Sequence, residues 1–156
     1  MCFLSALLTG KIDDKAHTCT YIKLLGDTEI TKLKTTSYKF PYPVADTESG
    51  PTLYWDRFVL EVNFVSYQNI SCKAIFDDVS HFEFISEDEV THGNYSYDGV
   101  VEVKNSPLIE KLVSVGEIDK SEALELKHIV IGFNEIGSYL TIVFKNDRYE
   151  HNTNIT

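Results

Sequence analysis

The chain is 156 residues long, 43% of its residues are hydrophobic, and its 24 acidic and 14 basic side chains give a formal net charge of −10 at pH 7. This apolar content excludes a disordered chain, and the length predicts a single domain over residues 1–156. The negative charge argues against binding to nucleic acid, which needs cationic side chains along the phosphates.

Targeting and cysteine patterns predict a protein of the cytoplasm. The apolar residues 3–8 have no basic segment before them and no small-residue cleavage site after them, so we expect no signal peptide. No window reaches the roughly 18 apolar residues that span a bilayer, and we expect no membrane contact. Cys2, Cys19 and Cys72 are an odd number of cysteines without CxxC spacing, which favours reduced thiols.

Residues 1–50 carry few clear signals and form the uncertain part of the chain. Alternating residues on both sides of Gly26 and Asp27 predict an early hairpin over 21–34. Pro41 and Pro43 predict an extended connector, because each proline removes a donor and restrains its neighbour. The sequence leaves open whether this N-terminal part completes the sheet.

Three consecutive strands are predicted in the middle of the chain. Residues 58–66 and 70–76 alternate in the period of two around a turn at 67–69, which predicts a hairpin. Residues 79–85 show the same period after two aspartates interrupt the second strand. We expect these three strands to form an antiparallel meander, with Cys72 as a buried core thiol.

One short helix is predicted at 106–115. Ser106 suits the N-cap, and apolar residues recur at helical spacing until Gly116, which is placed to end the helix in a left-handed conformation. Before this helix, the polar residues 86–98 predict an exposed loop and residues 100–103 a short strand.

The clearest hairpin is predicted near the end of the chain. Residues 127–133 and 138–144 both alternate, and residues 134–137 supply the turn. Residues 121–126 allow one helical turn before it, and the polar residues 146–156 predict a frayed tail. Together these elements predict an α+β fold, in which a largely antiparallel sheet curls into a half-barrel or sandwich with one short helix packed on it.

Candidate catalytic residues are few. His81 and Glu83 stand two apart on a predicted strand and therefore share a face, with Asp77 and Asp78 nearby, a pattern that could build a metal or acid–base site. We favour the alternative, the polar face of a half-solvated strand, because no second histidine lies within ligand spacing.

His128 is the other histidine that the strand pattern places. It shares a face with Val130 rather than with Ile129 and Ile131, so we expect an exposed, hydrogen-bonded strand histidine rather than a catalytic one. No motif of a hydrolase, a nucleotide-binding loop or a zincin occurs. We therefore expect no enzyme activity, no cofactor and no metal site.

The most informative feature is an acidic block between positions 77 and 102. It contains eight carboxylates and neither Lys nor Arg, and the hydrophobic residues threaded through it predict folded sheet and loop. An unneutralised acidic surface attracts and holds a basic macromolecule, and tyrosines add planar anchors for Lys and Arg. An ordinary solvated face is the alternative. The predicted partner-binding residues are Asp77, Asp78, Glu83, Glu87, Asp88, Glu89, Tyr95, Tyr97 and Asp98.

Residues 76–84, 98–107 and 126–139 together form a layout that resembles small uncharacterised bacterial proteins of the toxin-immunity type, from contact-dependent or polymorphic toxin systems. Turn, cap and strand signals carry the resemblance, which extends from residue 57 to residue 145. It implies stoichiometric neutralisation of one cognate toxin domain, often a basic nuclease, whose active cleft the acidic block would cover. The resemblance does not identify the contact residues of this chain position by position.

Two other functions stay open on the sequence. A curled sheet could hold a small ligand in an aromatic-lined cavity. The candidate lining residues of that cavity are Phe58, Phe64, Phe82 and Trp55. An enzyme would instead need His81 to converge with Asp77 or Asp78 in one cleft.

Overall fold

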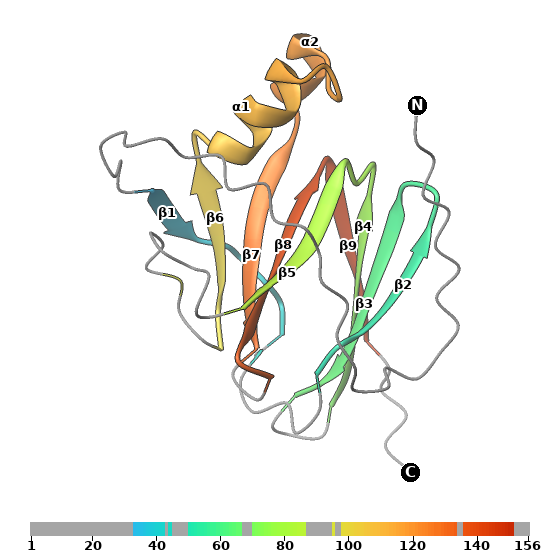
Figure 1. Cartoon of the computed structure of the whole chain (residues 1–156). Helices are drawn as coiled ribbons and strands as arrows, with labels where there is room; N and C mark the ends of the chain where they lie inside the picture. Colours follow the sequence, from blue (N-terminus) through green and yellow to red (C-terminus); the bar gives the residue numbers. More distant parts are fainter. Residues whose placement is uncertain are drawn as a thin grey trace, which may run out of the picture.

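The structure, a computed structural model, describes residues 33–42, 44, 50–66, 70–86, 95, 98–133 and 136–151. In this part of the chain two antiparallel sheets face each other, and two helices lie at one end of the larger sheet (Figure 1). The prediction of an α+β fold built on a largely antiparallel sheet is confirmed. The predicted hairpin at 21–34 lies outside the described residues, apart from its last two positions.

The larger sheet has five described strands in the order β1-β6-β7-β8-β5. These strands are β1 (Lys34–Ser37), β6 (Val100–Lys104), β7 (Lys127–Phe133), β8 (Ser138–Phe144) and β5 (His81–Ser86). The predicted hairpin of β7 and β8 is confirmed, with Ile129 opposite Ile142 and Ile131 opposite Leu140. Because side chains alternate along a strand, these four residues share one face, which packs in the main core.

The smaller sheet has four described strands in the order β2-β3-β4-β9. They are β2 (Thr52–Asp56), β3 (Val59–Val65), β4 (Ser71–Asp77) and β9 (Asn146–His151). The predicted hairpin of β3 and β4 is confirmed, with Leu60 opposite Phe76 and Phe64 opposite Cys72. Cys72 is 2% exposed, as the buried-thiol prediction requires.

Two strands that lie side by side pass from one sheet to the other, and we call this pair the corner ribbon. β4 continues into β5, and β8 continues through Lys145 into β9, while β4 pairs with β9 and β5 with β8. At the crossing, Lys145 N donates to Asp77 O (3.2 Å) and Ser80 N donates to Val143 O (2.9 Å). The ribbon is therefore hydrogen-bonded through both sheets.

The predicted meander was wrong, because β5 pairs with β8 and not with β4. Asp78 adopts a left-handed conformation with φ = 53°, and the turn there sends the chain into the opposite sheet.

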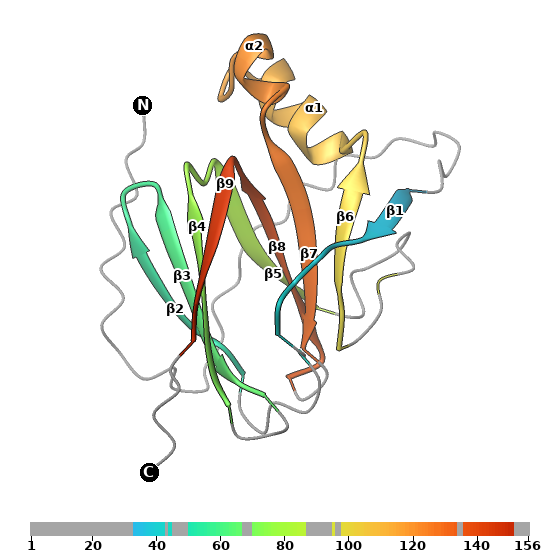
Figure 2. The ribbon, with the colours of Figure 1, turned by 180° about the vertical axis from the view of Figure 1, so that it is seen from behind.

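The predicted frayed tail was wrong for residues 146–151, which form β9 beside β4 (Figure 2). Tyr149 packs against the core between the sheets, whereas Arg148 and Glu150 form ion pairs on the outer side of the smaller sheet. β9 therefore alternates inward and outward side chains as a strand does, but because most of its residues are polar, the alternation was not recognised in the sequence. Residues 152–156 lie outside the described residues.

The predicted helix is confirmed as α1 (Pro107–Ser114), and α2 (Lys120–Ala123) follows it. Ser106 is the N-cap of α1, and its Oγ accepts a hydrogen bond from Ile109 N at 3.2 Å. Gly116 has φ = 78°, so it ends the helix in the left-handed conformation expected of glycine. Leu112 packs against the outer face of the larger sheet, the face turned away from the smaller sheet.

The main core fills the space between the sheets. Phe76 of the smaller sheet lies 4.8 Å from Phe144 of the larger one, and Phe64 lies 5.9 Å from Phe133, measured between ring centroids. Edge-to-face aromatic pairs of this kind stabilise beyond the area they bury. The core therefore draws on both sheets, and a single domain over residues 1–156 stays a prediction.

Candidate functional site

The outer face of the larger sheet carries a group of polar side chains. The strand register puts His81 and His128 on either side of Val143, in one row across β5, β8 and β7. Glu83 lies opposite Thr141 in the next row on the same face. α1 covers the end of this face at which His128 lies.

Part of the acidic block lies on this outer face. Glu83 is on β5, and Tyr95 packs on Tyr139 of β8 with 5.6 Å between ring centroids. His81 Nε2 lies 3.4 Å from Glu83 Oε1, and this contact with His81 is the main reason why the pKa of Glu83 is lowered. Burial raises the pKa of Tyr95.

Other members of the acidic block lie at the ends and edges of the sheets. Asp77 forms an ion pair with Arg148 on the outer side of the smaller sheet. Asp78 is exposed at the corner ribbon, and Asp98 is exposed ahead of β6, at the opposite end of the larger sheet. The remaining predicted members lie outside the described residues: Glu87, Asp88, Glu89 and Tyr97. The described members of the block are thus spread over both sheets and both ends of the larger sheet, and they do not form one compact patch.

His81 and Glu83 lie on one face, as predicted, but the convergence of His81 with Asp77 or Asp78 that an enzyme would need is not formed. The side chain that contacts His81 is Glu83, while Asp77 faces Arg148. In the described ranges no hydrogen bond or ion pair joins His81 to Asp77 or Asp78. The structure therefore does not bring those three residues together.

His128 is buried, 6% exposed, so the expectation of an exposed histidine was wrong. Its Nδ1 lies 2.7 Å from Ser106 Oγ and its Nε2 lies 2.6 Å from Thr141 Oγ1, so the predicted hydrogen bonding is present. Burial is the main cause that lowers the pKa of His128 to about 4; the neighbouring His81 acts in the same direction, and Glu83 acts against it. The imidazole is therefore neutral at neutral pH.

The short contact between Ser106 and His128 has the geometry of a nucleophile with its base. Its surroundings favour a structural role. Ser106 is buried and already accepts the N–H of Ile109 as a helix cap, and the second partner of His128 is the hydroxyl of Thr141 rather than a carboxylate. A weakly basic, enclosed histidine without an acidic partner is a poor general base. We interpret these contacts as a polar bridge between α1 and the sheet.

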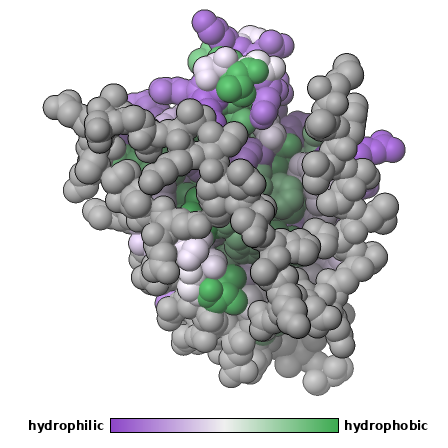
Figure 3. Space-filling model, viewed as in Figure 1, coloured by the Kyte–Doolittle hydropathy of each residue, from purple (hydrophilic) through white to green (hydrophobic). Residues whose placement is uncertain are grey.

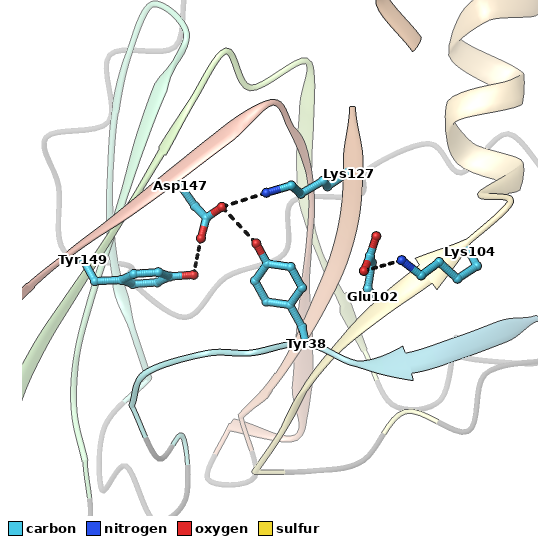
Figure 4. A network of polar contacts seen from close by, with 6 residues as sticks. All are labelled: Tyr38, Glu102, Lys104, Lys127, Asp147 and Tyr149. Carbon is cyan, nitrogen blue, oxygen red and sulfur yellow. Dashed lines mark hydrogen bonds and ion pairs between the residues drawn. The ribbon is translucent and has the colours of Figure 1, made fainter. Parts of the chain in front are cut away.

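A second polar network lies between the two sheets and joins their inner faces (Figure 4). Asp147 Oδ1 accepts hydrogen bonds from Tyr38 Oη (2.9 Å) and Lys127 Nζ (3.1 Å), and Asp147 Oδ2 accepts one from Tyr149 Oη (2.5 Å). Lys127 Nζ also lies 5.6 Å from the centre of the Phe144 ring. The network links β9 to β7 and to the segment that follows β1.

The pKa shifts in this network keep Asp147 negatively charged and Lys127 positively charged. Burial would raise the pKa of Asp147, but the hydrogen bonds from Tyr149, Lys127 and Tyr38 lower it below its usual value. Burial would lower the pKa of Lys127, but Asp147 raises it. Burial and the same carboxylate raise the pKa values of both tyrosines. Lys127 and the two tyrosines therefore keep their protons while Asp147 stays ionised, and the network stabilises the contact between the sheets.

Two concave regions are formed by described residues. A cleft of about 370 Å³ is formed by β1, the segment that follows it and the start of β6, and its lining includes Tyr38, Phe40, Tyr42 and Asp98. A groove of about 590 Å³ lies between α1 and α2.

The aromatic residues predicted to line a cavity do not share one wall. Phe58 is 67% exposed, Phe64 packs in the core on Phe133, and Trp55 contacts Phe82 with 4.9 Å between ring centroids. The cleft beside β1 is lined by other residues.

Within the described ranges, no three His, Cys, Asp or Glu side chains are grouped so that they could hold a metal ion. In the same ranges no helix has the length and apolar character needed to cross a bilayer. Comparison with protein-family models, with curated proteins and with solved structures finds no match to this chain. The resemblance to immunity proteins therefore stays a prediction.

The sequence patterns missed the network around Asp147. Tyr38, Lys127 and Asp147 are far apart in the chain, and each has an ordinary local context. One signal was available: Asp147 and Tyr149 alternate with Arg148, as they would on a strand.

Proposed function

We propose that this protein binds and neutralises a basic protein partner, in the way that an immunity protein neutralises a cognate bacterial toxin domain. The observation that carries the proposal is the acidic block, which holds eight carboxylates and no Lys or Arg between positions 77 and 102. Glu83 and Tyr95 of this block share the outer face of the larger sheet. A rigid sheet would hold such charges in place for a cationic surface.

The proposed mechanism is exclusion of substrate from the active cleft of a basic nuclease, by steric cover and by negative charge. The protein would act stoichiometrically in the cytoplasm, without a cofactor or catalysis of its own. Of the described carboxylates, Asp78 and Asp98 form no ion pair within the described residues, whereas Asp77 already binds Arg148. We therefore expect Asp78 and Asp98 to contribute more to the association rate than Asp77.

The test first asks whether a neighbouring reading frame encodes a large secreted protein with a basic C-terminal domain, which would be the toxin candidate. Association of that domain with the full chain is measured by stopped-flow fluorescence at 20 mM and 500 mM NaCl. If charge directs the encounter, the association rate should fall by at least about tenfold at the higher salt concentration. A rate that does not respond to salt would contradict the proposal.

Charge-reversal variants locate the contact. Asp78→Lys and Asp98→Lys should each slow association by about threefold to tenfold, as should reversal at Asp88 and Glu89. Asp56→Lys is the matched control, because Asp56 is exposed on β2 of the other sheet. A control that slows association as much as the test variants would point to a nonspecific effect of net charge.

The cleft beside β1 favours a second candidate function, binding of a small molecule. Its volume of about 370 Å³ lies within the range of ligand sites, and Tyr38, Phe40 and Tyr42 give it aromatic walls. Native mass spectrometry of the purified protein separates the two candidates. A stoichiometric copurified ligand, lost in Tyr38→Ala but retained in Asp78→Lys, would favour this second function.

A further inference from the structure

The groove between α1 and α2 is an apolar surface that the packing of these helices leaves open. Leu112 of α1 is buried against Ile118 and the sheet, whereas Ile109, Val113 and Ala123 are only half-buried. These three half-buried side chains line the groove, together with Glu110, Ser114 and Lys120. α1 therefore carries more apolar surface than its contact with the sheet uses.

Exposed apolar residues extend this surface beyond the groove. Leu124, directly after α2, is 88% exposed, and Val115, directly after α1, is 59% exposed. Figure 3 shows hydrophobic surface set among hydrophilic residues on the helices at the top of the molecule. Single exposed apolar residues are ordinary, but a set that adjoins an open apolar groove is typical of an interaction site.

The segment that contains the two helices, residues 107–126, is mainly negative, with five acidic and two basic residues. Glu110, Glu117, Asp119 and Glu122 are all exposed and form no ion pair in the part of the chain that the structure describes. Lys120 is the basic residue among those that line the groove. An apolar groove with an acidic surround is complementary to a segment that presents apolar anchors and basic flanks.

We propose that this helical groove, lined by Ile109, Val113 and Ala123 and extended by the exposed Leu124 directly after α2, docks a short basic amphipathic helix of a protein partner. An eight-residue helix is about 12 Å long, which matches two turns of a docked helix with anchors three or four residues apart. The inference deepens the proposed function and rests on it, since it requires a basic protein partner. It adds a contact on the helices, which pack on the same outer face of the larger sheet that carries Glu83.

The first experiment measures binding of a defined probe to the full chain. The probe is a fluorescein-labelled 14-residue synthetic peptide with leucines at three- and four-residue spacing on one helical face and lysines elsewhere. Two comparison peptides have every lysine replaced by glutamate, or the same lysines and leucines in scrambled order. Fluorescence anisotropy should show saturable binding of the first peptide and at least about tenfold weaker binding of the other two.

Variants then test the groove itself. Leu124→Asp should weaken binding of the lysine peptide by at least about tenfold, because it places a charge where an apolar anchor docks. Glu122→Lys should weaken it by about threefold or more. Leu124 is too exposed to support the fold, so a folding defect is not expected, and circular dichroism checks this. Phe58→Asp is the matched control, an exposed apolar residue of the β2–β3 turn, and should leave binding unchanged.

NMR shift mapping with the same peptide decides between the groove and the rest of the surface. Shifts confined to residues 107–126 support the inference. Shifts on β5 instead, equal binding of the glutamate peptide, or no effect of Leu124→Asp would each overturn it. Self-association that Leu124→Asp abolishes in sedimentation would also overturn it, because the groove would then bind a second copy of the chain.

The two proposals fail in different ways. Asp78→Lys should slow association with the toxin domain and leave binding of the lysine peptide unchanged. If the salt dependence and Asp78→Lys behave as proposed while every groove variant is silent, the groove inference fails and the proposed function stands. If the neighbouring toxin domain does not bind while the peptide maps to the groove, the proposed toxin partner is wrong and the groove still docks basic helices.

Discussion

His128 shows how one buried side chain can make the stability of this fold depend on pH. Its folded-state pKa is about 4, against about 6.5 in an unfolded chain, because the neutral ring is enclosed between α1 and the sheet. Between these two pKa values the unfolded state therefore binds a proton at His128 that the folded state does not bind. Stability from this group is fully present above pH 6.5 and is lost as the pH falls from 6.5 toward 4.

We predict that the free energy of unfolding falls by about 2 kcal/mol between pH 7 and pH 5 because of His128. Urea unfolding at both pH values measures this loss, and His81→Gln should retain most of it. An NMR titration of the His128 imidazole gives a direct check, with a midpoint near pH 4 expected. A midpoint near 6.5 would mean that the ring is not enclosed in solution.

At the scale of elements, β9 is held by its inward side chains. Tyr149 donates a hydrogen bond to Asp147 and packs edge-to-face on Phe40 (5.3 Å) and Tyr42 (5.8 Å), whereas Glu150 points outward to Lys73. The inward residues therefore decide the stability of the strand.

We predict that Tyr149→Ala lowers the free energy of unfolding by about 3 kcal/mol, the range for loss of an aromatic side chain from a core. Glu150→Ala, one position along, should change it by less than about 1 kcal/mol, because its ion pair is exposed. Urea unfolding of both variants compares the two faces of one strand. Equal effects at the two positions would show that β9 is not ordered in solution.

Elements whose signals come from neighbouring residues were predicted correctly. Ser106 caps α1 and Gly116 ends it because both effects act within one turn of helix. β7 and β8 follow from strict alternation and a short turn. β9 was missed because its alternation is between charged residues and a tyrosine, so the apolar period that marks a strand is absent.

At the scale of the whole molecule, the pairing of strands could not be predicted in the same way. β5 follows β4 closely in sequence, yet it pairs with β8, more than fifty residues further along. The choice depends on a turn at Asp78 and on the faces that β8 offers, neither of which is local to β5. The network at Asp147 could not be predicted for the same reason, because it joins Tyr38 to Lys127 and these residues are far apart in the sequence.

We predict that the two sheets unfold as one cooperative unit, because they share a core and the corner ribbon. Tyr149→Ala, in the smaller sheet, should lower the hydrogen-exchange protection of amides in β7 of the larger sheet as much as in β3. Exchange measured by NMR at pH 7 tests this. Unchanged protection in β7 would indicate that the sheets open independently, and would also count against a single domain.

The corner ribbon limits how the two sheets can move. Both crossings, at residues 78–80 and at Lys145, occur at the same end of the molecule and are tied by the hydrogen bonds of Lys145 and Ser80. One sheet cannot slide over the other without rupturing those bonds. We therefore expect a fluctuation that widens the space between the layers to have a smaller amplitude at Lys145 than at the opposite end, where Asp98 lies.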